Sequence, residues 1–284
     1  MKPVLLASLL LAACAAGDPV PSPSASGAPP ADSVADWRSA FAAEGTLGTA
    51  VLYNVATGRT TRHDPERAAE RFTPASTSKI WNGLVFLDRG VVADVDSVVA
   101  WDGVERWADA WNRDHSLRSG IEVSAVWLFQ QLAREVGRDG YDAVYSRQPY
   151  GNATMGEPLD QAWLDGSLRI SADEQVRFLD ALLHDRLAFS AEDQATVREI
   201  VPVLAEAGGA ALRGKTGWGR PDGEAEIGWV VGWVERPGTE PVVFAMNAEA
   251  APGATFDVYE GRMRILRAVL ADADVFPDGS DVRP

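Results

Sequence analysis

Strand-like segments occur in two groups that lie far apart in this 284-residue sequence, and their spacing constrains the fold most strongly. The first group covers residues 48–62 and contains one turn. The second group follows residue 210 and is typical of three strands, at 212–218, 226–235 and 241–247. An antiparallel sheet whose two halves are separated in the sequence accounts for this order.

Most of the remaining chain has helical spacing of its apolar residues. The segments are 31–44, 76–87, 121–136, 171–184, 191–206 and 256–271. The centre of 121–136 is apolar nearly all round, so we expect a buried helix there. The expected fold class is α+β: an antiparallel sheet flanked by N- and C-terminal helices, with a helical lobe at about residues 85–205 inserted in it. Residues 32–284 are near the upper limit for one core, so we expect one domain or two intimately joined lobes.

Residues 1–13 have the parts of a secretory signal peptide. One basic residue precedes an apolar run, Val4–Leu11, which is too short to span a membrane as a mature helix. The ending Leu11-Ala12-Ala13-Cys14 resembles the bacterial lipobox, which implies cleavage before Cys14 and a lipid on its thiol. An ordinary signal with an unrelated cysteine is the alternative. The lipoprotein is favoured because Cys14 is the only cysteine and stands where the lipobox requires one.

Residues 14–31 are rich in Ala, Pro, Ser and Gly and have too little bulk to bury, so we expect a disordered tether. The protein is then exported and lies in the periplasm or at the cell surface, held to a membrane through Cys14. A single cysteine excludes an internal disulfide. The net charge of −15, from 26 basic and 41 acidic residues, opposes binding of nucleic acid and of anionic lipid heads.

One segment, Gly209–Thr216, matches the phosphate-loop pattern G-x-x-x-x-G-K-T. A phosphate loop lies between a buried strand and a helix whose N-terminus faces the phosphates. Here residues 191–207 look helical, and residues 217–223, with three glycines and a proline, cannot start a helix. A nucleotide site is therefore disfavoured, and Lys215 is left for another role.

The segment Ser76-Thr77-Ser78-Lys79 offers a nucleophile and a base. On a helix, residues three apart share a face, with about 5–6 Å between their Cβ atoms. Ser76 in the first turn has the positive helix end behind it, which suits an oxyanion. The pattern alone is weak, because such spacing is common on solvated helices. The three histidines carry no local signature of a Ser-His-Asp system or of a zinc site, so we expect no metal.

Three further elements follow this one along the chain. Ser124 and Val126 lie in the predicted apolar helix, where the alternative is a serine bonded back to its own helix. Tyr150-Gly151-Asn152 is a polar segment, with a plain turn as its alternative. Lys215-Thr216-Gly217 lies on a predicted strand, where the glycine would let a substrate approach the backbone.

Together the four elements resemble the penicillin-recognising serine enzymes, and more closely the class D, or oxacillinase-type, β-lactamases. The resemblance covers nearly all of the folded chain and includes the segments WLDGSL and GKTGWG. Tyr-Gly-Asn points away from the class A enzymes, which have Ser-Asp-Asn at that place. The resemblance implies the serine β-lactamase fold and the hydrolysis of penicillin-type β-lactams.

The resemblance also implies roles for single residues. Ser76 would be the nucleophile, and Lys79, carboxylated by carbon dioxide or bicarbonate, would be the general base, held by the indole of Trp163. Ser124 and Lys215 would pass a proton to the leaving nitrogen. The backbone N–H groups of Ser76 and Trp218 would surround the oxyanion, and no other cofactor is implied. The substrate-binding residues would be Val126, Tyr150, Asn152, Thr216, Gly217, Trp218 and Arg262.

The chain departs from the class D pattern at two positions. Ser78 replaces an aromatic residue before the motif lysine, and Trp81 stands where proline is common. Ser78 would make the surroundings of Lys79 more polar and weaken its carboxylation, or else would face away. Two alternatives share the motifs, a penicillin receptor and a penicillin-binding protein, which acylate without fast turnover. The sequence leaves the β-lactam spectrum, the degree of Lys79 carboxylation and the oligomeric state open.

Overall fold

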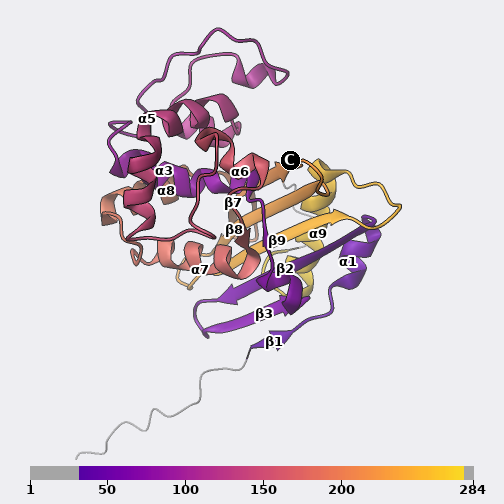
Figure 1. Ribbon diagram of the computed structural model, residues 1–284. Helices are drawn as coiled ribbons and strands as arrows, with labels where there is room; N and C mark the ends of the chain where they lie inside the picture. The colour runs from indigo at the N-terminus through magenta and orange to yellow at the C-terminus, as the bar shows by residue number, and fades with distance from the viewer. Residues whose placement is uncertain (1–31, 278–284) are drawn as a thin grey trace, which may run out of the picture.

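The computed structural model describes residues 32–277, and a seven-stranded sheet forms its centre (Figure 1). The strand order is β1-β3-β2-β9-β8-β7-β6. The strands are β1 Ser33–Val34, β2 Thr46–Asn54, β3 Arg59–His63, β6 Val203–Ala207, β7 Ala210–Gly219, β8 Ile227–Glu235 and β9 Val242–Ala250. β1 and β3 are parallel, and the other neighbouring pairs are antiparallel. The pairing of β2 with β9 joins the two strand groups and confirms the predicted sheet.

The sheet is buried on both faces, so its central strands are apolar without alternation to polar residues. In β9, Val243 and Ala245 belong to one hydrophobic cluster, whereas Phe244 and Met246 belong to a second cluster on the opposite face. Successive side chains of a strand point to opposite faces, which explains this division. The two clusters therefore share the backbone of the same strands.

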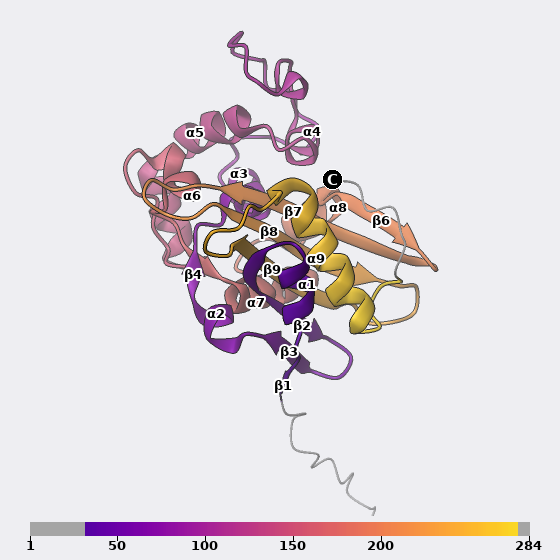
Figure 2. The same ribbon diagram turned by 90° about the vertical axis from the view of Figure 1, so that its right-hand side faces the viewer.

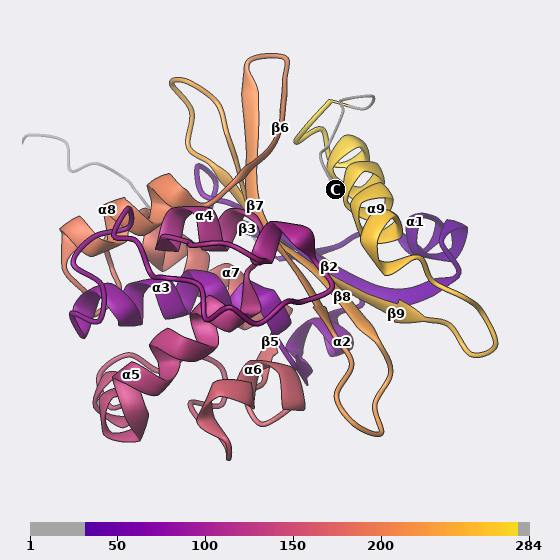
Figure 3. The same cartoon turned by 90° about the horizontal axis from the view of Figure 1, so that it is seen from above.

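Helices cover both faces of the sheet (Figure 3). α1 (Arg38–Ala43) and α9 (Val258–Asp272) lie on one face, and α9 begins at Asp257, whose carboxylate accepts from two backbone N–H groups of its first turn. α7 (Ala172–Leu183) packs against β2 and β9 on the other face. The mixed α+β architecture that the sequence predicts is confirmed.

The other elements gather at the α7 side of the sheet or connect it to the helices (Figures 1 and 2). The helices are α2 Pro65–Ala69, α3 Lys79–Asp88, α4 Leu117–Glu122, α5 Val126–Tyr145, α6 Ala162–Asp165 and α8 Ala191–Ile200. Three short 3-10 helices are η1 Ala75–Ser78, η2 Asp109–Trp111 and η3 Leu159–Gln161. β4 Arg71–Phe72 and β5 Ile170–Ser171 form a separate two-stranded sheet.

Over residues 32–277, no helix has both the length and the apolar character needed to cross a membrane.

The predicted helix at 191–206 is wrong in its second half. α8 ends at Ile200, and residues 203–207 form the edge strand β6, which pairs with β7. Pro202 cannot continue the helix, and the pairing with β7 overrides the helical preference of the Ala- and Glu-rich residues that follow.

The predicted continuous helix at 121–136 is also wrong. α4 ends at Glu122 and α5 begins at Val126, so Ser124 lies in a break between two helices. Ser124 has φ +61°, which no helix interior tolerates.

The signal peptide predicted at 1–13 and the tether predicted at 14–31 lie outside the described residues.

Candidate active site

Ser76 is positioned by η1, which continues directly into α3. The preceding residue, Ala75, has φ +49°, a left-handed conformation that is uncommon for a residue with a Cβ atom. This turn sets Ser76 in the first turn of the helical segment, with its side chain on a cavity. The positive end of the helix then favours negative charge close to Ser76.

Lys79, the first residue of α3, lies directly behind Ser76. Its Nζ donates a hydrogen bond to Ser76 Oγ at 3.0 Å, in keeping with the spacing of three residues. The lysine is fully buried, and its Nζ lies 4.9 Å from the centroid of the Phe129 ring. Burial disfavours the ammonium form and lowers the pKa of Lys79 from 10.5 to about 7. A large share of neutral amine is therefore present at neutral pH, where an ordinary lysine is almost wholly protonated.

Trp163 provides a buried hydrogen-bond donor close to this part of the chain. It lies on α6, which packs against η1, and its ring is fully buried. Within residues 32–277 its Nε1 has no hydrogen-bond partner. An indole N–H donates and cannot accept, so this orphaned donor fits an added anionic group. A partly neutral lysine amine and an unpaired indole N–H in the same region of the described chain fit a carboxylated lysine.

Ser124 reaches the same cavity from the break between α4 and α5. Its left-handed backbone costs on the order of 1–3 kcal/mol, so the surrounding structure must hold it. The peptide groups on both sides are fixed. The Ala125 N–H donates to Gly120 O at 2.9 Å, and Val123 O accepts from the Trp111 indole at 2.8 Å.

β7 forms the opposite wall and carries Thr216 and Gly217. A Cβ atom added at Gly217 would lie 2.9 Å from Pro74 O and 3.0 Å from Thr77 Cγ2. Glycine is therefore what allows β7 to approach η1 so closely. Arg262, from α9, donates from Nη1 to Gly217 O at 2.8 Å and fixes this stretch of the strand.

Buried basic groups give the site its electrostatic character. Lys215 on β7 is buried, and burial, then the positive charges of Lys79 and Arg262, lower the pKa of Lys215 well below 10.5. Burial also lowers the pKa of Arg262 to about 10, so this side chain remains charged at neutral pH. An anion bound here would favour the protonated forms of these groups. In a protein of net charge −15, the site is thus a local attractor for a carboxylate.

These elements meet at one cavity of about 540 Å³. Seven of the predicted site residues line it: Ser76, Ser124, Val126, Thr216, Gly217, Trp218 and Arg262. Lys79, Lys215 and Trp163 are buried in its surroundings and do not line it. The structure therefore brings together residues from η1, the α4–α5 break, β7 and α9.

Aromatic rings line the cavity on two sides. The Trp107 and Trp111 rings pack 5.3 Å apart between centroids, and the Trp218 and Tyr259 rings pack 5.6 Å apart. Trp107 and Trp111 belong to the segment between α3 and α4 that projects at the top of Figures 1 and 2. Such walls suit a ligand with an apolar or aromatic part beside its anionic group.

Nine residues that line this cavity were not among the predicted site residues, and Leu164, Arg220 and Tyr259 are three of them. The positions of two of these three, Tyr259 and Leu164, could have been inferred from the sequence. Tyr259 is three residues before Arg262 on α9 and so shares its face. Leu164 follows Trp163, so its position near the site could have been inferred. Arg220 is in the irregular segment after β7, where no periodicity predicts direction.

Tyr150 and Asn152 do not reach the cavity, so their predicted substrate contacts have no counterpart in this geometry. The Tyr150 ring is buried and stacks on Trp81 with 5.2 Å between centroids, and its hydroxyl donates to Gln175 Oε1 at 3.2 Å. The Asn152 amide donates to Ser167 O at 2.8 Å and accepts from the Arg169 N–H at 2.9 Å. Both side chains use their polar atoms to hold neighbouring segments of the protein.

The two departures from the class D pattern point away from Lys79. Ser78 is buried and its hydroxyl donates to Ala75 O at 2.7 Å, so its polarity is used within η1. Trp81 is the centre of an aromatic cluster with Tyr145, Tyr150 and Phe178. The pKa of Lys79 is low in spite of Ser78, which agrees with the second expectation for this serine.

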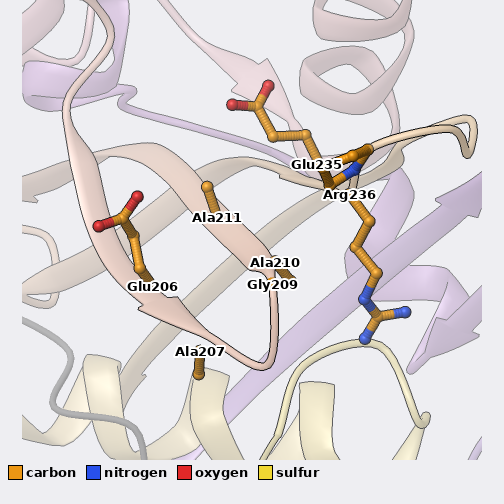
Figure 4. Close-up of a pocket in the computed structure, with 8 residues that line it drawn as sticks. Glu206, Ala207, Gly209, Ala210, Ala211, Glu235 and Arg236 are labelled. Carbon is orange, nitrogen blue, oxygen red and sulfur yellow. The ribbon is translucent and has the colours of Figure 1, made fainter.

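The phosphate-loop pattern has no phosphate-binding geometry. β7 runs through Gly219 as a strand, so no helix N-terminus follows Lys215. Gly209, the first glycine of the pattern, lies at a different cavity of about 680 Å³, shown in Figure 4. Glu206, Glu235 and Arg236 line that cavity, whereas Gly214, Lys215 and Thr216 do not, so the residues of the pattern do not share one site. The pattern is a chance match.

Comparisons with known proteins agree with this geometry. Residues 48–270 match the penicillin binding protein transpeptidase domain. The chain is 39% identical over 248 residues to β-lactamase OXA-3 of Pseudomonas aeruginosa, covering 85% of this chain and 86% of that protein. It is 37% identical over 242 residues to β-lactamase OXA-48 of Klebsiella pneumoniae, covering 85% and 89%.

Solved structures show the same likeness. FUS-1 (OXA-85), a class D β-lactamase from Fusobacterium nucleatum subsp. polymorphum, aligns with a TM-score of 0.78 and 34% identity over 84% of this chain and 98% of that one. The C-terminal domain of the Bacillus licheniformis BlaR penicillin receptor aligns with a TM-score of 0.80 and 30% identity over 88% and 99%. An enzyme and a receptor thus share this architecture.

Proposed function

Because the chain belongs to the class D β-lactamases of the penicillin-binding protein transpeptidase family, we propose that it hydrolyses penicillin-type β-lactams through an acyl-enzyme on Ser76. The observation that carries the proposal is the hydrogen bond of 3.0 Å between Lys79 Nζ and Ser76 Oγ, at a cavity with buried basic groups around it. A nucleophile, a neutral base and an attractor for the drug's carboxylate then occupy one site.

Substrate binding rests on β7 and α9. The carboxylate of the β-lactam would contact Arg262 and Thr216, which line one side of the cavity. The lactam carbonyl would then lie over Ser76, with its oxygen towards the backbone N–H groups of Ser76 and Trp218. The aromatic walls would receive the acyl side chain.

We propose that Lys79 acts as general base in a carboxylated form. Its neutral amine attacks carbon dioxide, a C–N bond forms, and the nitrogen loses one proton to solvent. The pKa of about 7 supplies that neutral amine, and the free Trp163 N–H can hold the resulting anion. Lys79 in this form accepts the Ser76 proton while Oγ bonds to the lactam carbon.

Ring opening and hydrolysis complete the cycle. The lactam C–N bond breaks, and the nitrogen receives a proton from Ser124, which is resupplied through Lys215 with the proton that Lys79 took from Ser76. Lys79, deprotonated again, takes a proton from water, the hydroxide attacks the ester carbon, and Lys79 returns that proton to Ser76 Oγ as it leaves. Carbon dioxide is the one cofactor in this cycle, and the reactants are the β-lactam and water.

The full chain, purified in mild detergent and mixed with a chromogenic cephalosporin, tests the activity. Sustained release of many products per enzyme is expected, together with covalent labelling by penicillin that Ser76→Ala abolishes. A burst of one product per enzyme would contradict turnover and favour a receptor, the alternative raised by the likeness to the BlaR domain. Labelling of the Ser76→Ala protein would show that another residue is the nucleophile.

The carboxylated lysine has a separate test in Trp163→Phe, which removes the buried N–H and keeps most of the ring. Loss of a donor to a charged group costs about 1.5–3 kcal/mol, so deacylation should slow by roughly 10- to 100-fold. The bicarbonate concentration needed for half-maximal turnover should rise. Trp81→Phe is the matched control, because it makes the same change at a second fully buried tryptophan, which lies in the aromatic cluster. An unchanged bicarbonate dependence in Trp163→Phe would refute the role of Trp163.

We also propose that the protein is exported and anchored through lipid on Cys14, which lies outside the described residues. The single cysteine at the end of an apolar N-terminal run supports this. In a Gram-negative expression host, the wild-type chain should fractionate with membranes, and Cys14→Ser should move the activity to the soluble fraction. Equal membrane association of both proteins would contradict a lipid anchor at this position.

A further inference from the structure

We propose that the indole N–H of Trp111 positions Ser124 for proton transfer, so that Trp111 is a positioning residue for acylation as well as a wall of the cavity. The inference rests on the proposed function, in which Ser124 delivers a proton to the leaving nitrogen. It concerns a residue whose ring faces the cavity and whose N–H is directed to the backbone next to Ser124.

The backbone at Ser124 needs support from outside its own helices. Residues with a Cβ atom rarely adopt φ near +61°, and without restraint Ser124 would relax to a negative φ. The peptide after Ser124 is held from α4, through the bond from the Ala125 N–H to Gly120 O. The peptide before it is held by Trp111, whose Nε1 donates to Val123 O at 2.8 Å. Trp111 therefore determines the orientation of the peptide that joins Val123 to Ser124.

Trp111 is itself fixed by the helix that begins after Ser124. The Trp127 Nε1, in the first turn of α5, donates to Trp111 O at 2.8 Å. His115 is buried, and its Nε2 donates to Ala110 O at 2.9 Å, which anchors the residue before Trp111. Trp127 on α5 therefore holds Trp111 in η2, and Trp111 in turn holds Val123 at the end of α4.

The consequence is specific to one step of the reaction. Without the indole N–H, Val123 O loses its donor and the restraint on the Val123–Ser124 peptide disappears. The Ser124 hydroxyl would then spend less time facing the cavity. The proton that the leaving nitrogen needs would arrive more slowly, whereas Ser76 and Lys79, held by η1 and α3, would keep their hydrogen bond.

A double-mutant cycle on the full chain separates this role from general support of the fold. The acylation rate constant would be measured in single turnovers with a chromogenic cephalosporin for wild type, Trp111→Phe, Ser124→Ala and the double variant. Trp111→Phe should slow acylation by about 10- to 100-fold in the protein that has Ser124, as expected for the loss of a hydrogen bond that holds a reacting group. In the Ser124→Ala background, Trp111→Phe should slow acylation by less than about two-fold, because the hydroxyl that Trp111 positions is already absent.

The matched control is Trp107→Phe in the same two backgrounds. Trp107 packs on Trp111 and lines the same cavity, but it is 74% exposed, so its change should have the same effect with or without Ser124. Trp111→benzothienylalanine keeps the bicyclic ring and removes only the N–H. It would be used if Trp111→Phe fails to fold, and the same coupling is expected.

Equal losses from Trp111→Phe in both backgrounds, or full activity of the benzothienylalanine protein, would refute the inference and leave the proposed function unaffected. An unchanged acylation rate in Ser124→Ala would instead refute part of the proposed function, the role of Ser124, and the inference with it.

Discussion

At the scale of single residues, the most consequential feature is the burial of Lys79. Its amine lies beside Phe129 and donates to Ser76 Oγ, and in the described part of the chain no carboxylate forms an ion pair with it. The protein therefore holds a base in a state that costs folding free energy. Functional groups of this kind lower stability in exchange for reactivity.

Lys79→Met should stabilise the protein while it removes activity. The pKa of Lys79 is about 7 in the folded chain and about 10.5 in the unfolded one. Between these values the unfolded chain binds more protons, so stability rises with pH and the lysine costs most near and below pH 7. Since one pKa unit corresponds to about 1.4 kcal/mol, the variant should gain on the order of 4 kcal/mol at pH 7.

The gain in the free energy of unfolding of Lys79→Met should shrink towards zero as the pH approaches 10.5. Urea unfolding in buffer free of carbon dioxide, at about pH 7 and about pH 9.5, measures the difference in the free energy of unfolding. A gain that does not change with pH would show that the lysine is not buried as a neutral amine.

At the scale of elements, the site depends on the close approach of β7 to η1. Gly217 permits this approach, because a Cβ atom there would collide with Pro74 O. The Arg262 bond to Gly217 O ties α9 to the same point. The nucleophile, the strand and the C-terminal helix are therefore positioned relative to one another through one residue without a side chain.

Gly217→Ala should push β7 away from η1. We expect kcat/KM to fall by about 10- to 100-fold, because misplacement of about 1 Å costs that much. The free energy of unfolding should fall by about 1–3 kcal/mol from overpacking. Steady-state kinetics and denaturant unfolding measure the two effects.

Gly83→Ala is the matched control. It lies within α3, and its new Cβ would meet Val197 Cγ2 at 3.6 Å, an ordinary contact. It should stabilise the helix by roughly 0.5–1 kcal/mol and leave kcat/KM within about two-fold of wild type. Activity of Gly217→Ala at the level of Gly83→Ala would show that the approach of β7 is not critical.

At the scale of the whole molecule, the two hydrophobic clusters are joined by the strands that they share. β8 contributes Trp229 and Val231 to one cluster and Val230 to the other. Loss of the side-chain packing on either face of the sheet therefore destabilises the strands that carry the active-site residues. α9 covers one face and also delivers Arg262 to the cavity.

Leu266→Ala tests this connection far from the chemistry. Leu266 is buried on α9, and its truncation should lower the free energy of unfolding by about 2–5 kcal/mol. β-Lactamase activity and far-ultraviolet circular dichroism should be lost at the same denaturant concentration. An activity transition that precedes the loss of secondary structure would show that the two faces unfold separately.

Features set by local geometry could be predicted from the sequence. The hydrogen bond between Ser76 and Lys79 follows from their spacing on one helix, and the strands at 212–218, 226–235 and 241–247 follow from apolar residues around turns. Their pairing into one antiparallel sheet follows because each strand must satisfy its backbone groups. These properties involve neighbours in the chain, and neighbours have few possible arrangements.

Features that depend on distant partners were decided by tertiary structure. Ser124 adopts φ +61° because Trp111 and Gly120, from outside the break, hold its flanking peptides. β6 is a strand because β7 lies beside it, although its residues favour a helix. Tyr150 turns into the core because Trp81 offers a ring to stack on. The sequence by itself determined which chemical groups are present and their local spacing, whereas packing determined where the side chains point, because a partner's position depends on the path of the whole chain.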